Sequence, residues 1–392
     1  MTFKNISPNA KADIRQNGVR IYMFCAGYVD TFISVFHSVE AFLGGLGTDP
    51  TIPVFGSHVP AYMEKANVQF LKDVMNYEIK EREIKEYPYD ENLIQSGDFL
   101  SITRLDGVDP IIMYGSGSHA GHSTMALRFD GELYVVESQD GWYWPKHGIQ
   151  RNKFSQWIEW AKNADFHVSH MPLSPESRAK FNESAAQAFF FETEGLAYGY
   201  HNFLFGWIDT PADNYPPLIP AGLIPIVFAI LEEFTPSTTD IFMDQALNKR
   251  LGTKGLNMNG LVAEAASRNM SIEDLMAMVE VEGWEYEGLL PRDGKSYVCS
   301  AYVAAIYRAA GLLPEKINGP EFTPKDVYTL NIFDKNYQRP AECAQANPDD
   351  LYCQIIGKYR MEHPGYSTIT PYENMAENCP TMAPEYFRPD RC

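Results

Sequence analysis

Basic side chains are scarce in this chain of 392 residues, which has 32 Lys and Arg against 51 Asp and Glu and a formal net charge of −19. A polyanion is repelled by such a surface at long range, so we expect no nucleic-acid partner. A mainly disordered chain is also disfavoured, because 45% of the residues are hydrophobic and only 21% are charged. The composition predicts a globular protein.

Long apolar runs are also missing. The most apolar stretch, 218–231, contains Pro220 and Pro225 and is shorter than the roughly 20 residues that cross a bilayer. We therefore expect no transmembrane segment. The first twenty residues are polar and lack the layout of a signal peptide, so export would imply that a signal has been removed.

Cysteine occurs six times, and four of these residues crowd into a polar, Pro-rich C-terminal tail: Cys343, Cys353, Cys379 and Cys392. Their spacing does not match paired zinc ligands, so no metal or other cofactor is expected, and disulfides would explain them better. Glycosylation-type triplets begin at Asn5, Asn182 and Asn269. Together these features favour a secreted or lumenal protein, lysosomal or vacuolar included.

The length exceeds what one hydrophobic core fills, roughly 250 to 300 residues, so additions to a central domain are expected. Composition and turn signals divide the chain into an N-terminal extension, a β-rich part, a helical insertion, a second part of the central domain and a Cys-rich tail: 1–90, 91–210, 211–290, 291–335 and 336–392. We predict an α+β fold.

A hairpin is predicted around Asp130-Gly131, between the runs HSTMALRF and ELYVVES. A two-residue turn there pairs Phe129 with Glu132. His122 then faces Gln139, and Glu137 lies diagonally from His122, within reach of a long side chain.

The most informative helix is predicted over 296–310, with Gly311 as its stop. Cys299 falls in its first turn, where unpaired N–H groups and the helix dipole favour a thiolate. A buried cysteine is often only a small core residue, so a nucleophile needs a nearby base.

His122 supplies that base, and Glu137 or Gln139 would orient its ring. His119 is the rival base, although it precedes the alternating run and has the wrong parity for this face. A metal held by His119 and His122 lacks a third ligand in the sequence.

The segments SGDFLSI, GHSTMALRFDGELYVVES and YVCSAYVAAIYRAAGLL resemble three signature pieces of the permuted NlpC/P60 family of papain-like cysteine hydrolases. In that family a strand with the catalytic His precedes a helix with the catalytic Cys, the reverse of papain's order. The likeness covers 95–210 and 292–315. It implies an antiparallel sheet packed on the nucleophile helix.

The resemblance implies that Cys299 is the nucleophile, His122 the base and Glu137 the orienting group. Tyr198, in GLAYGYHNFLFGW, is similar to a tyrosine that helps form the family's oxyanion site. The expected activity is that of a cysteine peptidase or amidase. Two alternatives stay open: a lipid acyltransferase or esterase that contacts a membrane surface through 218–231, and an inactive papain-like binding module.

Overall fold

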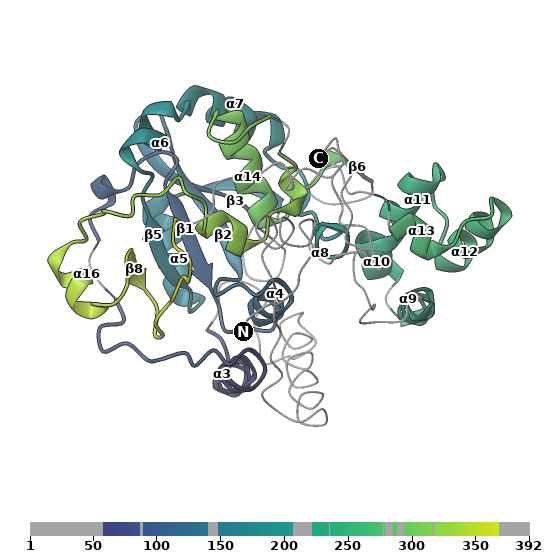
Figure 1. The fold of residues 1–392 in the computed structure, drawn as a ribbon, viewed down its shortest axis with the longest axis horizontal. Helices are drawn as coiled ribbons and strands as arrows, with labels where there is room; N and C mark the ends of the chain where they lie inside the picture. The colour runs from purple at the N-terminus through teal and green to yellow at the C-terminus, as the bar shows by residue number, and fades with distance from the viewer. Residues whose placement is uncertain are drawn as a thin grey trace, which may run out of the picture.

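The computed structural model describes residues 58–86, 89–139, 148–206, 222–234, 236–276, 278, 285–287, 294–315 and 317–367. Its centre is a six-stranded antiparallel sheet with the order β4-β3-β2-β1-β5-β8 (Figure 1). The strands are β1 (Phe99–Thr103), β2 (His122–Phe129), β3 (Glu132–Gln139), β4 (Gly148–Lys153), β5 (His167–Met171) and β8 (Cys353–Ile356). The predicted α+β class is confirmed.

Helices flank this sheet and extend beyond it. They are α3 (Ala61–Met75), α4 (Val108–Ser116), α5 (Phe154–Asn163), α6 (Pro175–Lys180), α7 (Glu183–Thr193), α8 (Asn202–Phe205), α9 (Leu223–Phe234), α10 (Pro236–Thr239), α11 (Gln245–Leu251), α12 (Met258–Ser267), α13 (Ile272–Met276), α14 (Cys299–Ala309), α15 (Pro324–Tyr328) and α16 (Ala341–Ala346). Shorter elements are η2 (Glu91–Leu93), η4 (Gly319–Glu321), the π-helical turn η3 (Asp240–Asp244) and a small ribbon of β6 (Glu285–Tyr286) and β7 (Gly294–Lys295).

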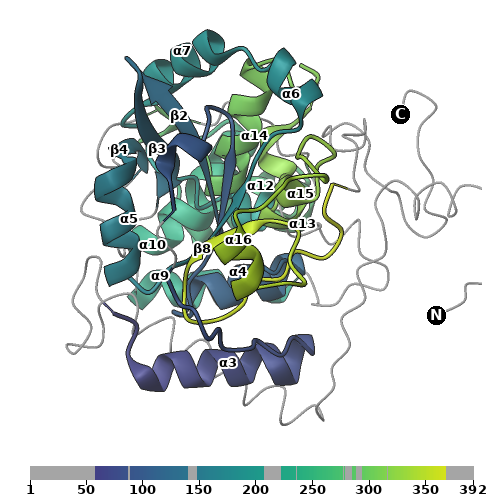
Figure 2. The same cartoon turned by 90° about the vertical axis from the view of Figure 1, so that its left-hand side faces the viewer.

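The helices α5 and α14 cover opposite faces of the sheet (Figures 1 and 2). Side chains of neighbouring β3 residues point to opposite faces. Glu137 accepts a hydrogen bond from Trp157 of α5, whereas the Ser138 hydroxyl donates to the backbone of Tyr297, just before α14. The molecule is therefore layered as helix, sheet and helix.

The hairpin has the predicted register. Asp130 and Gly131 both have positive φ, 53° and 82°, as a two-residue turn of the type I′ class requires. Phe129 pairs with Glu132, and Met125 pairs with Val136. Because this register holds, His122 and Glu137 lie where the sequence placed them.

The predicted helix from Ser174 to about Glu194 is two helices. Ser174 caps α6 as expected, with its hydroxyl accepting from the Ser177 N–H at 3.1 Å. The chain then leaves helical conformation at Phe181, and the Asn182 side chain caps α7 by accepting from Ala185. A second capping residue thus divides the segment.

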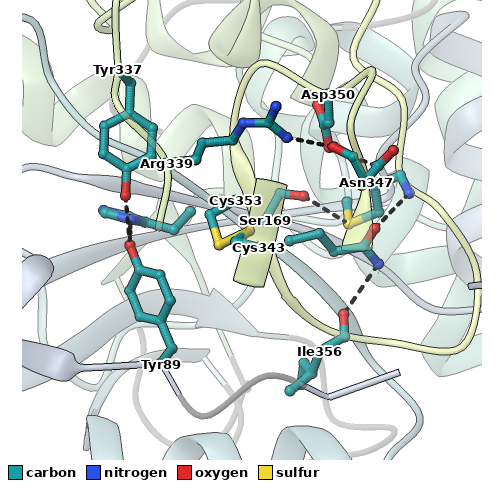
Figure 3. Close-up of a disulfide and its surroundings, with 12 residues drawn as sticks. Tyr89, Ser169, Tyr337, Arg339, Cys343, Asn347, Asp350, Cys353 and Ile356 are labelled. Carbon is teal, nitrogen blue, oxygen red and sulfur yellow. Dashed lines mark hydrogen bonds between the residues drawn. A yellow bond between two sulfur atoms is a disulfide. The ribbon is translucent and has the colours of Figure 1, made fainter. Parts of the chain in front are cut away.

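Part of the Cys-rich tail belongs to the main core. Strand β8 pairs with β5, and Cys353 forms a disulfide with Cys343 of α16 (Figure 3). Both sulfur-bearing residues are buried in the cluster that also holds the sheet's apolar side chains. The other two cysteines of the tail, Cys379 and Cys392, lie outside the described residues.

The helical insertion builds a core of its own, to one side of the sheet (Figure 1). Helix α9 contributes Ile224 and Phe228 to that core. Its other side exposes five large apolar residues: Ile226, Val227, Ile230, Leu231 and Phe234. Within the described ranges, no helix combines the length and the hydropathy needed to span a membrane.

Candidate active site

Cys299 is the first residue of α14 and is completely buried. The residue two positions before it, Tyr297, is fixed through its carbonyl oxygen. That oxygen accepts hydrogen bonds from the Ser138 hydroxyl at 2.6 Å and from the Gly199 N–H at 2.9 Å. The sheet and the segment before α8 therefore both fix the approach to the helix.

Val298, the N-cap of α14, is held by a side chain. Its N–H donates to Asn202 Oδ1 at 3.1 Å, and Asn202 is fully buried. At Gly199 a Cβ would lie only 2.8 Å from the carbonyl carbon of Tyr297, so the close approach of the two segments requires glycine. Neither Asn202 nor Gly199 was singled out from the sequence.

His122 and Glu137 form a buried pair. His122 Nε2 lies 3.0 Å from Glu137 Oε2, and the two residues are 8% and 1% exposed. A carboxylate can only accept, so Nε2–H donates and the imidazole's Nδ1 is left for the thiol. Of the two orienting groups that the sequence left open, the structure pairs Glu137 with His122.

Burial alone would lower the pKa of His122. The charge of Cys299 and its hydrogen bond to the imidazole oppose that effect, and so do the hydrogen bond and charge of Glu137. Together they raise the pKa of His122 well above its ordinary value of 6.5. The described geometry therefore brings the three predicted residues together and favours an imidazolium.

The second oxygen of Glu137 has its own donor. Trp157 Nε1 lies 3.1 Å from Glu137 Oε1, and Trp157 is fully buried. Sequence reasoning did not identify Trp157, because its partner is 20 residues earlier in the chain and on another element. The only local hint is that a buried indole N–H requires an acceptor.

Tyr198 lies beside the sulfur, with its hydroxyl 4.0 Å from Cys299 Sγ. Its ring packs against Tyr200, at a centroid separation of 4.9 Å, and against Phe203 at 6.0 Å. Tyr200 in turn contacts Phe242 of the insertion at 5.0 Å. An aromatic cluster therefore connects the insertion to the surroundings of Cys299.

The two alternative residues have other surroundings. Gln139 is buried at the end of β3, and its Oε1 has no hydrogen-bond partner among the residues that the structure describes. His119 stacks on Tyr77 at 3.9 Å, and burial lowers its pKa to about 4. His119 therefore lies as a neutral imidazole against Tyr77, whereas His122 is the histidine that pairs with Glu137.

Within the described part of the chain, no group of three or more His, Cys, Asp or Glu side chains is arranged to hold a metal ion. Comparison with known proteins found no match to a family model, a curated protein or a solved structure. The functional assignment accordingly depends on the geometry of the site.

Proposed function

We propose that this protein is a cysteine hydrolase that cleaves an amide, either a peptide or an amidated small substrate. The observation that supports this most is the buried set of Cys299, His122 and Glu137. A cysteine that only fills the core has no need of an imidazole paired with a carboxylate. Burying such a pair costs free energy, which a plain apolar contact would avoid.

The reaction begins with the Cys299 thiolate, whose sulfur bonds to the substrate carbonyl carbon. The carbon–nitrogen bond then breaks, and the His122 imidazolium gives its proton to the leaving amine. Water, losing a proton to His122, attacks the thioester and releases the acid and the free thiolate. The Tyr198 hydroxyl and the N–H groups at the start of α14 are the proposed donors to the oxyanion.

A papain-like fold of the permuted NlpC/P60 type is part of the same proposal. Its support is the order of the site in the chain, with the His strand β2 before the Cys helix α14, and the packing of α14 on β2 and β3. The buried Cys343–Cys353 disulfide supports residence in an oxidising, secreted or lumenal compartment.

Turnover of amide and ester libraries by the full chain, with Cys299→Ala and His122→Ala as comparisons, tests the activity. Hydrolysis should depend on both residues, and a covalent adduct on Cys299 should be recovered after acid quench. Equal turnover by Cys299→Ala would remove the nucleophile assignment.

An inactive binding module would leave Cys299 with ordinary reactivity. Alkylation at pH 6, followed by mass mapping of the Cys299 peptide, separates the two cases. The proposed enzyme should label at least about ten times faster than free cysteine, because a thiol beside an imidazolium is the more reactive one. A rate at or below that of free cysteine supports the module.

The second candidate is an acyltransferase or esterase for lipids. It is favoured by the exposed apolar side of α9, where Phe234 is 79% exposed and Ile230 is 55% exposed. The helix carries no Lys or Arg, so an uncharged lipid surface suits it better than an anionic one. The part of the predicted contact at 218–221 lies outside the described residues.

Flotation with phosphatidylcholine vesicles tests this candidate. Ile230→Glu should abolish binding, whereas Val262→Glu, at a solitary exposed position on α12, should leave it intact. Vesicle binding that both variants retain, or that the unmodified chain lacks, would speak against a lipid substrate.

A further inference from the structure

We infer that Trp157 is a positioning residue of the site, which holds the Glu137 carboxyl group in the orientation that faces His122. Only the expected effect on Cys299 reactivity rests on the proposed function. The orientation of the Glu137 carboxyl group, and the charge on His122 that depends on it, do not.

Both oxygens of Glu137 are used, each by a different partner. Oε2 accepts from His122 Nε2 at 3.0 Å, and Oε1 accepts from Trp157 Nε1 at 3.1 Å. Glu137 is 1% exposed, so water cannot replace a lost donor readily. Hydrogen bonds to a charged group are stronger than those between neutral groups, so the indole N–H is a strong restraint on the Glu137 carboxyl group.

The indole is itself fixed in place. Trp157 is fully buried, and its ring packs against Phe154 at 6.4 Å and Phe166 at 6.3 Å. Because the donor cannot follow a moving acceptor, turning the plane of the Glu137 carboxyl group away from the two donors loses a hydrogen bond. The two contacts therefore define one orientation, the one in which Oε2 faces the imidazole.

Loss of the indole N–H has a definite electrostatic consequence. Without that donor the carboxyl group is free to turn away from His122, and the imidazolium loses the hydrogen bond and the nearby charge that favour it. The pKa of His122 then falls, and the neutral imidazole is favoured. An uncharged imidazole stabilises the Cys299 thiolate less.

A plain core role for Trp157 would look different. Large buried rings fill volume, and their replacement changes stability without changing the charge on a neighbouring imidazole. The charge state of His122 thus separates the two roles, and it can be measured whether or not the protein turns over a substrate.

Histidine ¹⁵N chemical shifts of the full chain at pH 6 provide that measurement. Trp157→Phe keeps an aromatic ring but lacks the donor. It should lower the imidazolium-to-imidazole ratio of His122 by about 10- to 100-fold, the factor expected from one hydrogen bond to a charged group. Alkylation of Cys299 at pH 6 should slow in parallel.

Trp160→Phe, on the same helix, is the matched control and should leave both readouts unchanged. If Trp157→Phe fails to fold, benzothienylalanine at position 157 keeps the shape of the ring system and replaces the N–H with sulfur. A folded protein without the N–H but with an unchanged His122 spectrum would overturn the inference. A shifted spectrum in a chain that hydrolyses nothing would uphold it while removing the proposed function.

Discussion

Replacing Glu137 by glutamine tests how strongly one carboxylate charge controls the site. The two side chains are nearly isosteric, so the amide oxygen of the Glu137→Gln variant can still accept from His122. The charge is gone, and the Trp157 N–H then loses its acceptor, because the amide has only one oxygen. Two unit charges about 4 Å apart interact by about 4 kcal/mol at an effective dielectric constant near 20, which corresponds to about 3 pKa units. We expect the pKa of His122 to fall by about that amount.

The fall follows from the balance at His122. Burial is the largest influence and lowers its pKa, and the interactions with Cys299 and Glu137 together outweigh it. With Glu137→Gln, the imidazolium of His122 loses its proton at a lower pH. The pH range in which a charged His122 lies beside Cys299 therefore ends at a lower pH.

The assay is a histidine NMR titration of the folded protein, read alongside Cys299 alkylation between pH 5 and pH 9. His170, which pairs with Asp98 at 2.9 Å elsewhere in the sheet, is an internal reference and should give the same signals in both proteins. A His122 pKa that stays within about half a unit of the starting value would refute the reasoning, because a charge this close cannot be screened by bulk water.

Three further outcomes concern stability. Replacing both Cys343 and Cys353 by Ala should lower the free energy of unfolding by about 3 kcal/mol, the loop-closure estimate for a separation of 10 residues, measured in urea. Burial lowers the pKa of His363 to about 3, so its neutral form stabilises the fold above pH 6.5 and that contribution falls as the pH drops toward 3. His363→Gln should therefore remove about 2 kcal/mol of the stability difference between pH 7.5 and pH 5, and an unchanged difference would contradict this account. Burial raises the pKa of Asp244 to about 7, so stability is lost as the pH rises from 4 through 7, and Asp244→Asn should flatten that loss by about 1–2 kcal/mol in the same assay.

The hairpin and the position of the thiol could be predicted because both are local properties. Asp130-Gly131 determines the turn, and the turn determines which residues face each other. Likewise, Gly311 adopts positive φ, 79°, just beyond α14, as the helix stop at that position predicts. At the other end of the helix, Cys299 lies in the first turn, as expected.

Contacts between distant elements could not be predicted in the same way. Nothing in the local sequence indicates that Trp157 of α5 meets β3, or that Asn202 caps the segment before α14. The place of 353–356 in the main sheet could not be predicted for a related reason. The apolar residues of the tail show no periodicity of their own, because β8 completes an existing sheet rather than forming a separate core.

His122 and its acceptor Glu137 are close in the chain, whereas the sulfur of Cys299 comes much later. His122, Glu137 and Trp157 fall within one stretch of 36 residues, and Cys299 follows only after the insertion. A nascent or partly unfolded chain would therefore carry an unremarkable thiol. The proposed nucleophilicity of Cys299 depends on the docking of α14, so conditions that loosen this docking should abolish the proposed activity before they unfold the sheet.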